Sequence, residues 1–288
     1  MLKQRIITAL VLAPAAIAAI FYLPLVYFAI LFLAILAIGS WEWGPLMGLN
    51  STGYRLSFVA TNIALIAGIW VIVSPNEIWL NSNTIHDFAL SILWLAVAWW
   101  LISAFLMFSY PKTSSFWSKY RTIRGMFGCL TLIPTWLSFM VIRTNDYQID
   151  SYHGAQLLML LFVMVWSADV GAYFVGKSFG KNKLMPNVSP GKTFEGFIGG
   201  IIAACILVAL TAYLLSWSQE QALKALLVTI LITTVSVLGD LNESMFKRQA
   251  GVKDSGSILP GHGGILDRID SLTATAPVFA LCYVLFGW

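Results

Sequence analysis

Nine apolar stretches, each close to the length of a membrane span, constrain the fold of this chain more than any other feature of its sequence. They cover residues 5–22, 25–43, 55–74, 88–109, 125–142, 155–176, 196–217, 222–241 and 271–287. The hydrocarbon core of a bilayer is about 30 Å thick, and a helix of about 20 apolar residues crosses it. Only 10% of the 288 residues are charged, far below the roughly 25% of soluble domains. The pattern predicts an all-α polytopic integral membrane protein with about nine transmembrane helices.

The first apolar stretch has a second interpretation, as a cleaved signal peptide. Lys3 and Arg5 precede the apolar run, and small residues occur at positions 13–19, as they do in secretory signals. We favour a retained helix because eight further spans follow it.

The distribution of basic residues predicts the orientation of the helices. With nine spans and a cytoplasmic N-terminus, all but two of the 17 Lys and Arg residues fall in cytoplasmic segments. The exceptions, Arg143 and Lys224, fall on the opposite side together with the C-terminal Trp288. This asymmetry agrees with the positive-inside rule. It also accounts for the net charge of +4, so we expect no nucleic-acid partner.

The acidic residues point to the C-terminal part of the chain as the place of the chemistry. Most of those near the predicted cytoplasmic side follow residue 168. Asp169 lies well inside an apolar span, where a carboxylate costs about 2.5–3.5 kcal/mol and usually serves a function. The alternative is a structural partner for a Lys or Arg of another helix.

A polar stripe is predicted at the cytoplasmic end of the span 222–241. If the helix continues past that end, Asp240, Ser244 and Lys247 share one face at i, i+4, i+7 spacing. A carboxylate, a hydroxyl and an ammonium together suit a metal ion plus a phosphate. A helix end whose polar residues merely meet lipid headgroups remains the alternative.

The segment NVSPGKTFEGFIGG, residues 187–200, opens the seventh span. Ser189 and Pro190 form a good N-cap and first-turn pair, and a helix start of this kind binds anions. Lys192 and Thr193 would add a charge and a hydroxyl. The segment is not a P-loop, because Pro186 stands where that motif needs Gly. The GxxxG spacing of Gly196 and Gly200 predicts close helix packing.

The densest group of charged residues lies between positions 244 and 270. It combines four basic residues with three aspartates and several glycines, whose backbone N–H groups can approach phosphate oxygens. The basic residues are Lys247, Arg248, Lys253 and Arg268, and the aspartates are Asp254, Asp267 and Asp270. Mg²⁺ usually binds one or two carboxylates together with substrate phosphates. These residue types therefore favour a Mg²⁺–phosphate site at the cytoplasmic face over ordinary interfacial charge.

The whole of this stretch, SMFKRQAGVKDSGSILPGHGGILDRID, resembles the signature of the phosphatidate cytidylyltransferases, also called CDP-diacylglycerol synthases. The positions that match the signature are Ser244, Lys247, Arg248, Lys253, Asp254, Gly256, Pro260, His262, Gly263, Gly264, Asp267, Arg268 and Asp270. SPGKTFEGFIGG and the run from Asp169 to Tyr173 also look like that family. The N-terminal half agrees only in being a series of hydrophobic spans.

The resemblance implies a reaction in phospholipid biosynthesis, in which CTP and phosphatidate give CDP-diacylglycerol and pyrophosphate. It also implies Mg²⁺ as the cofactor and a homodimer. Within that reaction we expect Asp240 and Asp267 to bind Mg²⁺, with a second cation in a two-metal arrangement as a further option. We expect the basic residues Lys247, Arg248, Lys253 and Arg268 to neutralise phosphates. The remaining substrate-binding candidates are Asp169, Ser189, Lys192, Thr193, Ser244, His262, Gly263 and Gly264.

The predicted domains follow from this division of residue types. Residues 1–150 would form about five spans that serve as scaffold and dimerisation surface. Residues 151–288 would form a catalytic domain of about four spans plus a cytoplasmic loop, 244–270. We expect a bacterial inner-membrane protein whose active site faces the cytoplasm.

Two alternative functions remain open at this point. A CTP-dependent lipid kinase of the polyprenol or phytol type would use the same residue types but release CDP in place of pyrophosphate. A cation or proton transporter would use Asp169 and Asp240 as pathway carboxylates. The transporter interpretation leaves the cluster of basic residues and glycines unexplained.

Overall fold

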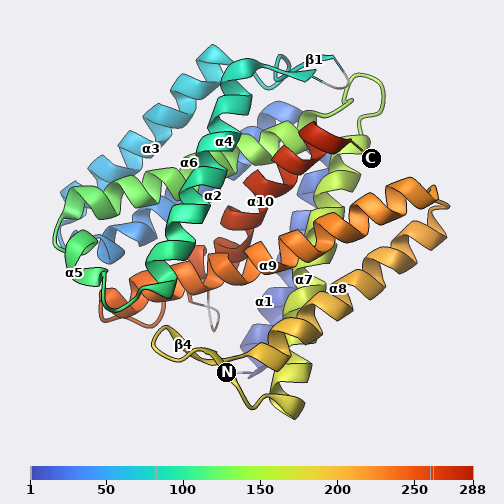
Figure 1. The fold of residues 1–288 in the computed structure, drawn as a ribbon. Coiled ribbons are helices and arrows are strands. Elements are labelled where there is room, and N and C mark those ends of the chain that lie inside the picture. The colour runs from blue at the N-terminus through green and yellow to red at the C-terminus, as the bar shows by residue number, and fades with distance from the viewer. Residues whose placement is uncertain (1, 82–83, 260, 262, 288) are drawn as a thin grey trace.

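The structure is a computed structural model that describes residues 2–81, 84–259, 261 and 263–287, with the side chains of all of these except residues 2–7 and 9. Its described helices are α1 (Leu2–Tyr22), α2 (Leu25–Leu46), α3 (Thr52–Ile72), α4 (Asp87–Phe108), α5 (Ser114–Trp117), α6 (Arg121–Thr144), α7 (His153–Phe179), α8 (Phe194–Leu214), α9 (Gln219–Gln249) and α10 (Leu266–Phe286). Two short antiparallel pairs, β1 (Trp79–Asn81) with β2 (Thr84–Ile85) and β3 (Lys183–Met185) with β4 (Ser189–Thr193), connect them. The start of α1 and the β3–β4 hairpin lie at one end of the molecule, and β1 lies at the other (Figure 1).

The predicted all-α membrane architecture is confirmed. Among the residues that the structure describes, eight helices are long and apolar enough to cross a membrane. The remaining predicted span, the first in the chain, is α1, whose apolar segment within the described residues is Leu10–Tyr22. The orientation of the termini stays a prediction.

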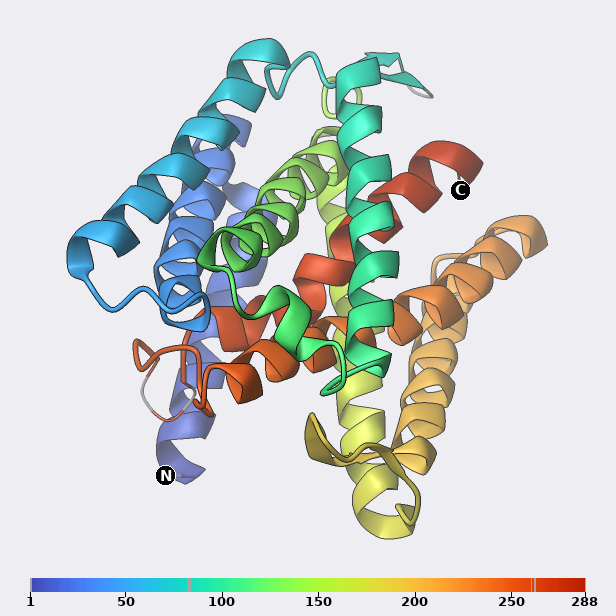
Figure 2. The same ribbon diagram turned by 60° about the vertical axis from the view of Figure 1, so that its left-hand side comes forward.

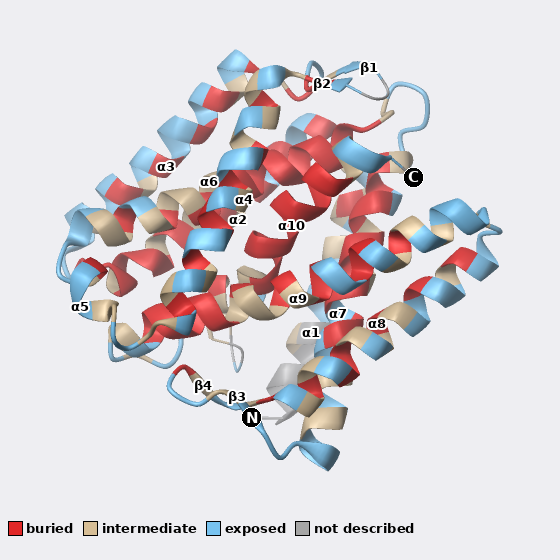
Figure 3. Ribbon diagram, viewed as in Figure 1, coloured by how far each residue is buried: buried red, intermediate tan, exposed pale blue. Residues whose placement is uncertain are grey.

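The two most buried spans, α6 and α10, form the centre of the helical bundle (Figure 3). They pack against each other, and α10 also packs against α9 and α4. By contrast, α3 and α8 expose large apolar side chains such as Val71 and Ile206. Outward-facing apolar side chains of this kind suit a lipid environment, because lipid tails are equally apolar and the side chains need no shielding from water.

The helices α7 and α8 form an unusually close pair that carries the β3–β4 hairpin at one end (Figure 2). A Cβ atom added at Gly196 would lie 2.9 Å from the backbone oxygen of Ala172, and one added at Gly200 would lie 2.7 Å from that of Ala168. Only glycine allows the two backbones to approach this closely. The close packing predicted from the GxxxG spacing is therefore confirmed.

The predicted helix start at Ser189 is wrong. Ser189 begins strand β4, and α8 starts at Phe194 with Thr193 as its N-cap. The Thr193 hydroxyl accepts a hydrogen bond from Gly196 N at 3.1 Å. Because residues 189–193 pair with β3, Ser189 and Pro190 cap no helix and provide no anion site of the predicted kind.

The cytoplasmic loop predicted over residues 244–270 is shorter in the structure. The helix α9 continues to Gln249 and α10 begins at Leu266, so the connecting loop is 250–265. The polar residues at both ends of the signature therefore lie on helices, where packing fixes their direction.

Candidate active site

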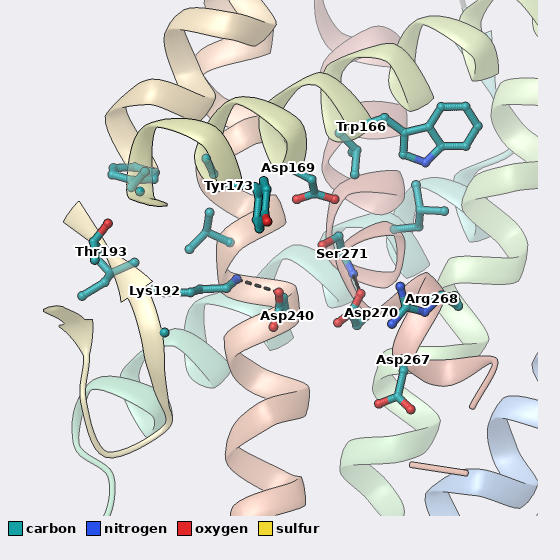
Figure 4. A pocket seen from close by; sticks show the side chains of 18 of the residues that line it. Trp166, Asp169, Tyr173, Lys192, Thr193, Asp240, Asp267, Arg268, Asp270 and Ser271 are labelled. Carbon is teal, nitrogen blue, oxygen red and sulfur yellow. Dashed lines mark hydrogen bonds and ion pairs between the residues drawn. The ribbon is translucent and has the colours of Figure 1, made fainter. Parts of the chain in front are cut away.

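A polar cavity of about 590 Å³ lies between α7, the hairpin β3–β4, α9 and α10. We refer to it as the polar cavity. Seven of the residues predicted to bind metal, phosphate or substrate line it, namely Asp169, Lys192, Thr193, Asp240, Lys247, Asp267 and Arg268. The elements α7, β4, α9 and α10 supply them, and Figure 4 labels all of them except Lys247. The fold thus brings together residues that are as much as 99 positions apart in the chain.

Three carboxylates from three different helices border the centre of the polar cavity. Asp169 lies on α7, Asp240 on α9 and Asp270 on α10, and their side chains face a common space (Figure 4). Lys192 of β4 forms an ion pair with Asp240, with Nζ 2.7 Å from Oδ2. The Ser244 hydroxyl donates to the other Asp240 oxygen at 3.3 Å. Like charges in one space repel each other, so this arrangement favours the binding of further cations.

Asp267 has a different environment from Asp240. Its Oδ1 lies 2.7 Å from the Lys247 ammonium, and its Oδ2 accepts hydrogen bonds from the backbone N–H groups of Ser255 and Gly264 at 3.0 and 2.8 Å. The Asp267 side chain is only 6% exposed. This carboxylate therefore ties the connecting loop to the first turn of α10, and its role as a metal ligand stays a prediction.

Lys247 is the centre of a buried ion cluster. Besides Asp267, its Nζ contacts Glu243 Oε1 at 3.2 Å, and both side chains of this second pair are almost inaccessible to solvent. Buried ionic groups persist only when their partners satisfy them. Lys247 therefore joins α9 to α10 at the wall of the cavity.

A residue that the sequence did not single out completes the loop anchorage. Glu42 of α2 is 2% exposed, and its carboxylate accepts hydrogen bonds from Ile265 N at 3.1 Å and Leu266 N at 2.8 Å. These are free N–H groups at the start of α10, where a negative charge stabilises the helix. A side chain at Gly264 would collide with this carboxylate. Through Glu42, the N-terminal helix α2 thus holds the end of the loop between α9 and α10 in place.

The suitability of the site for a metal ion can be judged from its ligands. Within the described part of the chain, no three His, Cys, Asp or Glu side chains converge into a complete metal cage. Mg²⁺ does not need one, since it usually takes one or two carboxylates and fills its octahedron with water and substrate phosphates. Asp240, whose side chain is 35% exposed, fits a cation that is shared with a phosphate ligand.

Other predicted residues lie beside the polar cavity and do not line it. These are Ser189, Ser244, Arg248, Lys253, Gly263 and Gly264. Arg248 instead supports the hairpin by donating to Val188 O at 3.3 Å. Gly263 has a φ of +82°, a conformation that suits glycine. His262 lies outside the described residues.

The helix α7 contributes two residues to the polar cavity that were not predicted as site residues. Tyr173 and Lys177 follow Asp169 at four-residue intervals, and all three line the cavity. The Lys177 ammonium lies 5.7 Å from the centre of the Tyr173 ring. The i, i+4, i+8 spacing is the signal that would have found them.

Comparison with known proteins places the chain among related sequences over its full length. A family model described as "Cytidylyltransferase family" matches residues 3–286. The phosphatidate cytidylyltransferase of Haemophilus influenzae is 41% identical over 287 residues, which are 98% of this chain and 99% of that protein. Its namesake from Pseudomonas aeruginosa is 42% identical over 288 residues, covering 100% and 99%. The Bacillus subtilis protein of the same name is 42% identical over 56% of this chain.

Proposed function

This chain belongs to the cytidylyltransferase family, and we propose that it is a phosphatidate cytidylyltransferase, which converts CTP and phosphatidate into CDP-diacylglycerol and pyrophosphate. The observation that carries the proposal is the polar cavity, where three carboxylates lie beside Lys192, Lys177 and Arg268. Carboxylates suit a divalent cation, and the basic side chains suit phosphate groups.

The chemistry needs little more than positioning and charge neutralisation. A phosphate monoester has a second pKa of about 6, so the lipid phosphate is already an anionic nucleophile at neutral pH. One of its oxygens forms a bond to the α-phosphorus of CTP. The bond from that phosphorus to the oxygen bridging toward the β-phosphorus breaks, and pyrophosphate leaves with the electron pair. The barrier lies in bringing two anions together, which oriented charges lower.

We propose that Mg²⁺ binds at Asp240 with help from Asp270, which faces the same space. A bound Mg²⁺ neutralises charge on the reacting phosphates. Asp240 is open to the cavity, whereas Asp267 already accepts hydrogen bonds from the loop and from Lys247. Asp267 would join the metal only by exchanging one of these partners, and a second cation remains part of the same proposal.

The basic residues of the polar cavity differ in their ion-pair partners, and we assign their roles on that basis. Lys192 is paired with Asp240 and can turn its ammonium to a phosphate when a cation takes that carboxylate. The Arg268 guanidinium has no ion-pair partner among the described residues. We assign these two side chains to substrate phosphates, and Lys247 to the structural support of the site.

The membrane setting of the proposal follows from the helices and from the distribution of charge. Eight helices suit a bilayer, and the two relatives named first come from bacteria. We propose a location in the inner membrane with the polar cavity facing the cytoplasm, since the Lys and Arg residues gather in the segments expected on that side. A homodimer is part of the same proposal.

Incorporation of label from CTP into lipid tests this function. Purified protein is incubated with cytosine-labelled CTP, Mg²⁺ and phosphatidate in detergent micelles. The proposal predicts a labelled lipid and the release of pyrophosphate. Release of labelled CDP would indicate the lipid kinase, and the absence of any nucleotide-dependent product would overturn the proposal.

A further inference from the structure

The hairpin β3–β4 forms one wall of the polar cavity and carries Lys192 into it (Figure 4). A single two-stranded hairpin is marginally stable in water, so its attachments to the helices decide where Lys192 lies. At its base, the carboxylate of Glu195, in the first turn of α8, accepts hydrogen bonds from Lys181 N at 3.0 Å and Asn182 Nδ2 at 2.7 Å. The base is therefore tied to α8, and the rest of the hairpin needs another support.

The strand β4 packs against α9 and is attached to it at two points. In the first attachment, Lys192 Nζ lies 2.7 Å from Asp240 Oδ2. In the second, the carbonyl oxygen of Val188, directly before β4, accepts a hydrogen bond from Arg248 Nε at 3.3 Å. An extended chain covers about 13 Å from Val188 to Lys192, and a helix rises about 12 Å from Asp240 to Arg248. The two attachments therefore match in spacing.

Arg248 connects the tip of the hairpin to the loop that follows α9. Its Nη1 donates to Val252 O at 3.5 Å, and Val188, whose carbonyl its Nε contacts, is fully buried. A guanidinium offers donors in several fixed directions and can therefore bridge two carbonyl oxygens. Arg248 is exposed, does not line the polar cavity and forms no ion pair among the residues that the structure describes. These contacts support a clamp on the hairpin in place of the predicted contact with a phosphate.

We propose that Arg248 is a positioning residue, which clamps the hairpin against α9 and so keeps Lys192 in the polar cavity during turnover. The inference rests on the proposed function, in which a divalent cation binds Asp240 and releases Lys192 for a substrate phosphate. When that ion pair breaks, only the hydrogen bond from Arg248 to Val188 O remains of the two attachments. Arg248 thus acts on the substrate through Lys192, because it fixes the strand from which the ammonium extends.

A double-mutant cycle of Arg248→Ala and Lys192→Ala tests whether one residue acts through the other. We expect Arg248→Ala alone to raise the KM of the same substrate as Lys192→Ala does, by about fivefold, as the loss of one hydrogen bond would, with kcat little changed. In the Lys192→Ala background, the same substitution should raise that KM by less than about twofold, because the two effects are coupled. Effects that add in the double variant, or no effect of Arg248→Ala, would overturn the proposal.

Two further variants separate the clamp from the loss of a positive charge. Arg248→Lys keeps the charge but lacks the planar fork of donors, so we expect it to behave like Arg248→Ala. Lys181→Ala is the matched control, since it removes an exposed cation at the base of the hairpin, outside the cavity lining, and it should leave both KM values at the wild-type level. Wild-type kinetics of Arg248→Lys would mean that the charge alone suffices, which would overturn the clamp.

Hydrogen exchange of the hairpin amides tests the clamp without turnover. The full-length wild-type protein and Arg248→Ala are labelled in detergent, with and without Mg²⁺ as the only addition, and exchange is measured over residues 188–193. Since Mg²⁺ competes with Lys192 for Asp240, we expect it to accelerate this exchange by about fivefold or more in Arg248→Ala, which then lacks both attachments, and much less in the wild type. Equal exchange of the two proteins in both conditions would overturn the proposal.

The exchange readout also separates this inference from the proposed function. Faster hairpin exchange in Arg248→Ala, without any labelled lipid from the wild type in the CTP assay, would retain the clamp and reject the activity. Labelled lipid from the wild type, combined with additive effects in the cycle and unchanged exchange, would reject the clamp alone.

Discussion

The ammonium of Lys247 lies 2.7 Å from Asp267 Oδ1, and this contact joins the end of α9 to the first turn of α10. The same Asp267 carboxylate holds the loop between these helices through Ser255 N and Gly264 N. A residue predicted as a metal ligand is therefore also a structural anchor. The two roles lead to different outcomes for the same substitution.

Asp267→Asn should abolish turnover and also destabilise the protein by about 3 kcal/mol, because it leaves the Lys247 ammonium with one buried carboxylate fewer. The measurement is the melting temperature with and without Mg²⁺, in parallel with activity. We expect the melting temperature to fall in both conditions. A melting temperature that is unchanged without Mg²⁺, combined with lost activity, would instead assign Asp267 to the metal. Asp254→Asn is the control for the melting temperature, since that aspartate lines the same cavity but is exposed.

Glu42→Ala should loosen the start of α10 from a distance of more than 220 positions in the chain. It removes two charge-assisted hydrogen bonds, each contributing about 1.5–3 kcal/mol. We expect faster hydrogen exchange at the amides of Ile265 and Leu266, and a smaller effect for Glu42→Gln. Glu77→Ala, which changes an exposed turn residue shortly before β1, serves as the control. Unchanged exchange at the two amides would contradict the anchoring role.

Lys192→Ala should raise the KM for one substrate by about tenfold, because the variant loses one charge-assisted hydrogen bond to a phosphate. Lys183→Ala removes a lysine from the partner strand of the same hairpin, outside the cavity lining, and should leave both KM values unchanged. Steady-state kinetics with CTP and phosphatidate varied in turn will distinguish the substrates. If Lys192→Ala leaves both KM values at the wild-type level, Lys192 does not bind substrate.

Gly200→Ala should destabilise the α7–α8 pair by about 1–3 kcal/mol, the usual range for overpacking. The added methyl group would lie 2.7 Å from Ala168 O, and the displacement would reach Asp169 one residue further on. Gly68→Ala is the matched control on a lipid-facing helix, where a Cβ meets nothing within 4 Å. Thermal unfolding in detergent compares the two. Equal melting temperatures of the two variants would mean that α7 and α8 accommodate the added methyl group without loss of stability, which would contradict the prediction.

The helical spans could be predicted because their length and apolarity are local properties, set by the thickness of the bilayer. The stripe of Asp240 and Lys247 was also predictable, since α9 continues past the apolar run and places both residues at the cavity. The role of Glu42 was not, because its partners Ile265 and Leu266 are distant in the chain. No local pattern states which helix end an isolated buried carboxylate will cap.

The misplaced start of α8 has a physical cause as well. Ser189 and Pro190 suit the beginning of a helix, but the same residues also suit an edge strand, where proline is tolerated. Pairing with Lys183–Met185 decides between the two, and Thr193 takes over as N-cap. A single sequence gives both readings similar weight until the partner strand is known.

The most direct test of the central claim follows both ends of one CTP molecule. Protein with phosphatidate and Mg²⁺ receives CTP labelled on the cytosine and, with a second isotope, on the γ-phosphate. The account predicts that the cytosine label enters the lipid and that the γ-label leaves as pyrophosphate, in equal amounts. A γ-label found in the lipid, with the cytosine label released as CDP, would contradict it.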